Sequence, residues 1–101
     1  MEKLNDLNFK EKINNGFVLV DFYAEWCGPC RMMHPVLEEV STERSNIKIM
    51  QVNVDDASNT AKEYGVMSIP TLILFKDGME VAKKIGFIPK EQLLDWIHEF
   101  E

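Results

Sequence analysis

One nearly continuous apolar run limits the folds open to this chain more than any other feature. It consists of Phe17, Val18, Leu19, Val20, Asp21, Phe22, Tyr23 and Ala24. A strand with one face in water alternates apolar and polar residues, whereas a strand covered on both faces is apolar throughout. Residues 17–24 therefore predict the central strand of a sheet that is packed between two layers.

A second β-rich run, residues 47–54, follows a segment with helical periodicity. Four apolar residues of that segment recur at i, i+3, i+4 and i+7, namely Met33, Val36, Leu37 and Val40. This spacing predicts a helix that packs its apolar stripe on the sheet. A strand, helix, strand unit is right-handed almost without exception and joins parallel strands. We therefore expect residues 17–24 and 47–54 to run parallel.

Two short helices are predicted around this unit. Asn8 and Glu11 have the spacing of a capping box, which predicts a first helix that begins at Asn8 and stops at Gly16. Residues 57–65 predict another short helix that ends at Gly65.

The C-terminal third predicts a hairpin followed by a helix. Asp77 and Gly78 form a strong turn signal between the β-rich runs 71–75 and 79–83, so the sheet should be mixed. Pro89 opens a last helix, in which apolar residues again fall at i, i+3, i+4 and i+7: Leu93, Trp96, Ile97 and Phe100. The predicted fold class is α/β.

Composition narrows the class of protein. The chain has 101 residues, of which 46% are hydrophobic and 28% charged, with a formal net charge of −6. One domain of this length buries roughly 65% of its unfolded surface, and its negative charge would repel nucleic-acid phosphates. Neither a signal peptide nor an apolar stretch of about 18 residues is present. We expect a single domain over residues 1–101 that is cytoplasmic and monomeric, with no nucleic-acid or membrane partner.

The only two cysteines lie where the predicted central strand meets a helix, in the motif Trp26, Cys27, Gly28, Pro29, Cys30. On a first helical turn, residues i and i+3 share a face, and their Cα atoms fall within the roughly 4.4–6.8 Å that a disulfide requires. The helix N-terminus favours the thiolate at Cys27. Gly28 leaves the approach to that sulfur open, and Pro29 suits a helix start.

A zinc site is the alternative for these cysteines. Zinc usually takes four protein ligands, and the sequence has no second pair of this spacing. His34 follows Cys30 by four positions, but His98, the only other histidine, lies far along the chain. We therefore expect a redox pair with no metal and no other cofactor, and we assign no role to either histidine.

Thiol–disulfide exchange is the expected chemistry. Cys27 would attack a substrate disulfide as the nucleophile, and Cys30 would resolve the mixed disulfide. Asp21 lies within the apolar strand, where burial raises a carboxyl pKa and suits it to accept the proton of Cys30. The alternative for Asp21 is a buried structural carboxylate with a hydrogen-bond partner.

With the motif of residues 26–30 and a second one at 69–71, Ile-Pro-Thr, the chain resembles the thioredoxin family over nearly its whole length. Further matching pieces are 21–25, Pro35, 53–55, 75–78 and Gly86. The resemblance implies a thioredoxin fold, with a central mixed sheet flanked by helices on both faces. It also implies a protein disulfide reductase that acts on disulfide-containing client proteins and is recharged by an NADPH-linked thioredoxin reductase.

The resemblance implies a substrate groove beside the cysteines. Sequence alone favours an ordinary trans Pro70 at the start of a strand, whereas the family holds this proline cis. The backbone before Pro70 would then be free to pair with an extended substrate strand. The implied groove residues are Trp26, Gly28, Pro29, Ile69, Pro70 and Gly86.

Three positions depart from the family pattern. Tyr23 stands where tryptophan is frequent and keeps an aromatic wall. Gln51 stands where lysine is common, so we expect Asp21 to lack a partner cation and its pKa to rise further. Phe87 follows Gly86 where a small residue is usual, and it narrows the groove or adds apolar surface to it.

Two other functions remain open. The chain could be an oxidase or isomerase, but Gly28 and Pro29 between the cysteines resemble reducing thioredoxins, whereas oxidants carry histidine there. It could also be a non-catalytic interaction module with this fold. The presence of both cysteines, with Asp21 behind them, favours a reductase.

Overall fold

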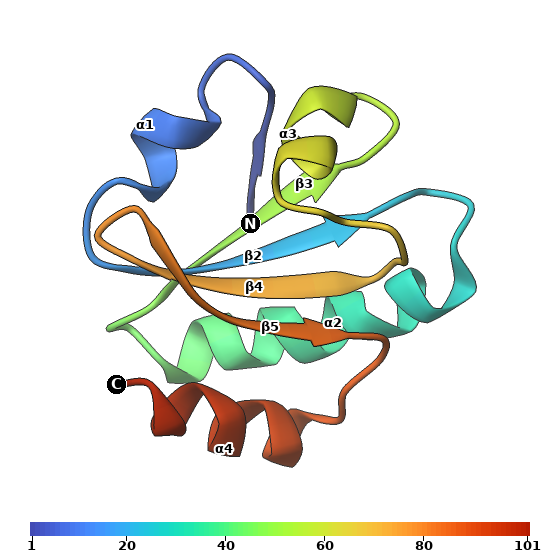
Figure 1. Ribbon diagram of the computed structural model, residues 1–101. Coiled ribbons are helices and arrows are strands. Elements are labelled where there is room, and N and C mark those ends of the chain that lie inside the picture. Colours follow the sequence, from blue (N-terminus) through green and yellow to red (C-terminus); the bar gives the residue numbers. More distant parts are fainter.

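Five strands form one mixed sheet between two layers of helices (Figure 1). The computed structural model describes all 101 residues. The strands are β1 (Glu2–Leu4), β2 (Phe17–Tyr23), β3 (Lys48–Asn53), β4 (Thr71–Lys76) and β5 (Met79–Ile85). The helices are α1 (Phe9–Ile13), α2 (Gly28–Glu43), α3 (Ser58–Glu63) and α4 (Lys90–Glu99). Figure 1 shows α1 and α3 on one face of the sheet and α2 and α4 on the other.

The strand β2 lies at the centre of the sheet, whose order is β1-β3-β2-β4-β5. It pairs parallel with β3 and antiparallel with β4. Val18, Val20 and Phe22 belong to the core cluster under α1 and α3, and Leu19 belongs to the cluster under α2 and α4. The prediction of a central strand that is covered on both faces is confirmed.

The helices α2 and α4 share one core cluster. Met33, Leu37 and Val40 of α2 are fully buried, and they belong to the same cluster as Leu93 and Ile97 of α4. Both predicted stripes therefore pack on the sheet, and α4 completes the cover of the face on which α2 lies. No helix is long and apolar enough to cross a lipid bilayer.

The N-terminal region differs from the prediction in two ways. The strand β1 was not predicted, because it has only three residues and only Leu4 is buried. The capping box at Asn8 is wrong: its side chain caps no helix N–H but accepts from the backbone N–H of Asn5 at 2.8 Å. Asn5 in turn accepts from the N–H of Leu7 and Asn8, at 2.9 Å each, so a local turn takes the polar groups that a cap would use.

The turn between β4 and β5 is tied to the loop before β2. Asp77 and Gly78 both have positive φ, 49° and 85°. The Asp77 carboxylate accepts from the N–H of Gly16 at 2.8 Å, and the Asp77 N–H donates to the Gly16 carbonyl at 2.9 Å. A Cβ atom at Gly78 would lie 3.3 Å from Asn14 Oδ1. The hairpin signal is confirmed, and the turn holds the start of the central strand.

We expect Gly78→Ala to lower the free energy of unfolding by about 1–2 kcal/mol, because a side chain at positive φ is strained. Chemical denaturation at pH 7 measures this loss. Gly28→Ala is the matched control, since its new Cβ would meet no atom closer than 4.0 Å. Equal stability of Gly78→Ala and the unchanged protein would contradict the expectation.

Candidate active site

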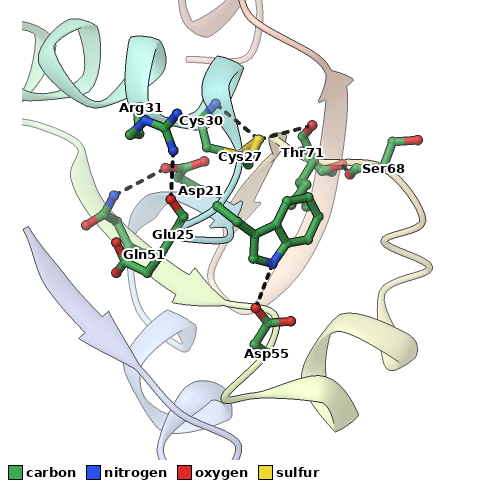
Figure 2. Close-up of a disulfide and its surroundings, with 11 residues drawn as sticks. Asp21, Glu25, Cys27, Cys30, Arg31, Gln51, Asp55, Ser68 and Thr71 are labelled. Carbon is green, nitrogen blue, oxygen red and sulfur yellow. Dashed lines mark hydrogen bonds between the residues drawn. A yellow bond between two sulfur atoms is a disulfide. The ribbon is translucent and has the colours of Figure 1, made fainter.

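A disulfide joins Cys27 and Cys30 at the N-terminus of α2 (Figure 2). Their Cα atoms are 5.2 Å apart, within the range predicted from the helical spacing. Cys27 is the N-cap residue of α2, and its Sγ accepts from the backbone N–H of Cys30 at 3.3 Å. Pro29 lies in the first turn of α2, where a backbone N–H has no partner within the helix, so the missing N–H of proline costs no hydrogen bond.

The loop that precedes β4 lies against Cys27. The Ile69–Pro70 peptide bond is cis, as the family resemblance implied. The Sγ atom of Cys27 lies 3.8 Å from the carbonyl oxygen of Ile69. The N–H of Gly86 donates to the carbonyl of Pro70 at 2.8 Å, so Gly86 is tied to the same loop whose Ile69 contacts the disulfide.

The indole of Trp26 stands at the surface beside the disulfide and is 69% exposed, which excludes a core role for it. Its Nε1–H donates to Asp55 Oδ2 at 2.9 Å (Figure 2). The Asp55 N–H donates to the Asn53 side chain at 2.9 Å. Sequence reasoning gave Asp55 no role; its only signal was its place in a matching piece, residues 53–55.

Phe87 remains 39% exposed next to Gly86. It therefore adds apolar surface beside the groove residues, one of the two effects expected from the sequence.

The carboxyl of Asp21 is completely buried on the α2 side of the sheet. Asp21 and Gln51 are direct neighbours in the β2–β3 register, and Gln51 Nε2 donates to Asp21 Oδ2 at 3.3 Å. Oδ1 has no hydrogen-bond partner within the protein. Desolvation raises the pKa of Asp21 from its ordinary value of 3.8 to about 6, and the Gln51 hydrogen bond opposes that rise. The predicted direction of the pKa shift is confirmed.

A cavity of about 240 Å³ opens behind the disulfide. It is lined by Lys3, Tyr23, Ala24, Glu25, Cys30, Arg31, His34 and Gln51. His34, to which the sequence assigned no role, places its Nδ1 atom 3.4 Å from Gln51 Nε2 and its Nε2 atom 3.0 Å from Glu38 Oε1. The fold thus connects the buried carboxyl of Asp21, through one amide, to a histidine at the cavity wall.

Comparison with known proteins identifies the chain's relatives. The family described as Thioredoxin matches residues 1–99. Thioredoxin of Chlamydia caviae is 52% identical over 92 residues, which cover 91% of this chain and 90% of the relative. Thioredoxin of Staphylococcus aureus strain Mu50 is 50% identical over 94 residues, which cover 92% of this chain and 90% of that relative.

Solved structures agree with the sequence comparison. The crystal structure of oxidised mitochondrial thioredoxin 3 from Saccharomyces cerevisiae matches with a TM-score of 0.91 at 36% identity, covering 98% of this chain and 94% of that one. A second match is a chain from a study of the thiol resolving mechanism in yeast mitochondrial 1-Cys peroxiredoxin via glutathione/thioredoxin systems. Its TM-score is 0.90 and its sequence identity is 35%, and the match covers 98% of this chain and 94% of that one. The chain therefore belongs to the thioredoxin family, and Cys27 and Cys30 are the redox-active pair of a protein disulfide reductase.

Proposed function

We propose that Cys27 attacks client disulfides and that Cys30 resolves the resulting mixed disulfide. The Cys27 thiolate bonds to one substrate sulfur and the other leaves as a thiolate. Cys30 then gives up its proton and attacks Cys27, which releases the second substrate thiolate and leaves the Cys27–Cys30 disulfide. Two electrons pass from the dithiol to the substrate.

The different surroundings of the two sulfurs carry this assignment. Cys27 Sγ lies against the Ile69 carbonyl on the groove side, and it accepts an N–H at the start of a 16-residue helix. Backbone donors and the positive helix end favour a thiolate there. Cys30 instead lines the cavity that it shares with Gln51, so we expect a substrate in the groove to meet Cys27 first.

Asp21 is our proposed proton acceptor for Cys30. Its carboxyl lies on the sheet face that α2 covers, and its pKa of about 6 suits proton transfer near neutral pH. Its free oxygen, Oδ1, has no partner that would compete for a proton. Cys30 lines a cavity together with Gln51, the hydrogen-bond partner of Asp21, and a water molecule would carry the proton between Cys30 and Asp21.

The substrate would lie as an extended strand along the groove of Trp26, Gly28, Pro29, Ile69, Pro70 and Gly86. The ladder of β4 begins at Thr71, so Ile69 lies just outside it. A substrate backbone paired there gains affinity from main-chain hydrogen bonds and little sequence selectivity. This arrangement suits a reductase with many clients.

Variants of the two cysteines test the order of attack. Cys30→Ser should accumulate a stable mixed disulfide with a disulfide-containing protein such as insulin, since attack proceeds but resolution cannot. Cys27→Ser should accumulate none. Non-reducing gel electrophoresis followed by mass spectrometry measures both products, and equal trapping by the two variants would overturn the assignment.

The electron donor would be a thioredoxin reductase that draws on NADPH, and the clients would be proteins with accessible disulfides. The family membership and the yeast peroxiredoxin study support such partners. With a purified bacterial thioredoxin reductase, we expect NADPH to be consumed in proportion to the insulin disulfides reduced. Insulin reduction by this protein with dithiothreitol, but not with NADPH and several such reductases, would contradict this donor. The cytoplasmic location stays a prediction.

Replacing the carboxyl of Asp21 should raise the stability of the fold and lower its activity. At pH 3.5 the folded chain holds the proton and the unfolded chain is mostly protonated, so ionisation of Asp21 hardly changes the free energy of unfolding. As pH rises towards 6, only the unfolded chain ionises freely, and the free energy of unfolding falls by about 3 kcal/mol in all. Asp21→Asn should therefore be more stable by about 1–3 kcal/mol at pH 7 and equal at pH 3.5, and it should resolve mixed disulfides more slowly.

Denaturant unfolding at both pH values and single-turnover reduction measure these effects. Asp95→Asn, an exposed position on α4, is the control for removal of one negative charge. If Asp21→Asn is less stable and fully active, Asp21 is a structural carboxylate and the proton-acceptor role is wrong.

A further inference from the structure

We infer that His34 is a positioning residue for Asp21: its imidazole holds the Gln51 amide in the orientation that directs an N–H at the Asp21 carboxylate. The inference rests on the proposed role of Asp21 as proton acceptor for Cys30. It adds to that role the group that sets the hydrogen bonding of the acceptor.

One amide nitrogen joins three elements of the fold. Gln51 Nε2, from β3, lies 3.3 Å from Asp21 Oδ2 on β2 and 3.4 Å from His34 Nδ1 on α2. A side-chain amide has two N–H groups on this nitrogen, so it can donate to both acceptors at once. Gln51 is 4% exposed, so these two partners are the ones that decide how its amide is turned.

Glu38 determines which imidazole nitrogen accepts. Glu38 Oε1 lies 3.0 Å from His34 Nε2, one helical turn along α2. An ionised carboxylate only accepts hydrogen bonds, so in the neutral imidazole the proton lies on Nε2 and the lone pair on Nδ1. Nδ1 therefore accepts from Gln51. If the amide turned over, its oxygen would face the lone pair of His34 and the carboxylate of Asp21, both of which repel it.

The Gln51 N–H is the one donor that the fold supplies to Asp21, because Oδ1 has no partner. This bond opposes the rise in the pKa of Asp21 that burial causes. Without His34, the amide loses one of the two contacts that fix its orientation, and its N–H faces Asp21 for less of the time. The carboxyl should then bind its proton more tightly. The other charged or titratable side chains around the cavity are Lys3, Tyr23, Glu25, Cys30 and Arg31.

The pH midpoint of Asp21 ionisation tests the inference directly. It is followed by carbon NMR of the Asp21 side-chain carboxyl in the reduced, full-length protein. We expect His34→Ala to raise the midpoint by about half a pH unit, a roughly threefold higher proton affinity. His34→Asn offers an acceptor oxygen near the place of Nδ1 and should restore the original midpoint. His98→Ala, which removes the other histidine, should leave it unchanged.

A double-mutant cycle separates action through Gln51 from a direct charge effect. In Gln51→Met there is no amide to orient, so adding His34→Ala should not move the midpoint further. An unchanged midpoint in His34→Ala would overturn the inference, as would an equal shift with Met at position 51 or failure of His34→Asn to restore it. If Gln51→Met does not fold, the comparison of His34→Ala with His34→Asn still tests the inference. Both of these variants should fold, because the His34 side chain is half-exposed.

This test is independent of the proton-acceptor role. The midpoint reports only how Asp21 is hydrogen-bonded, whatever its part in catalysis. If Asp21→Asn resolves mixed disulfides at the original rate, the proposed function of Asp21 fails while the midpoint still decides on His34. If the roles of Asp21 and of His34 are both correct, the pH profile of mixed-disulfide resolution should shift in His34→Ala by the same half unit.

Discussion

The burial of β2 on both faces is the constraint on which the rest of the structure depends. Its side chains alternate between two core clusters, so that helices must cover each face of the sheet. Its C-terminal end delivers the chain to the start of α2 and so places the cysteines. The same burial removes one carboxyl, Asp21, from bulk solvent and raises its pKa, so this strand determines both the fold and the protonation chemistry of the site.

Much of the fold could be predicted from the sequence, because its main elements carry strong periodic patterns. The central strand, the stripes of α2 and α4 and the turn at Asp77 and Gly78 each rest on local spacing. The strand β1 carries no such pattern, since its pairing depends on where β3 lies. The expected cap at Asn8 failed because Asn5, an equally good local partner, competes for the same groups.

In the candidate site, too, the features that depend on local sequence could be predicted and those that depend on tertiary packing could not. The cysteine pair and the buried Asp21 could be predicted because each depends on its own segment, whereas the cis bond at Pro70 came from family resemblance alone. The contact of Gln51 with His34 joins a strand to a helix, and that of Trp26 with Asp55 joins two loops. Such pairs are created by tertiary packing, and no local pattern in one sequence marks them.

The shared core of α2 and α4 has a consequence for how the protein comes into being. A chain leaves the ribosome from its N-terminus, so the helix that bears the thiols emerges well before the helix that completes its cover. Until Leu93 and Ile97 join Met33 and Leu37, the apolar stripe of α2 is only partly protected. The core between α2 and the sheet therefore closes only after α4 has been synthesised, whereas the cysteines belong to a separate cluster that contains no residue of α4.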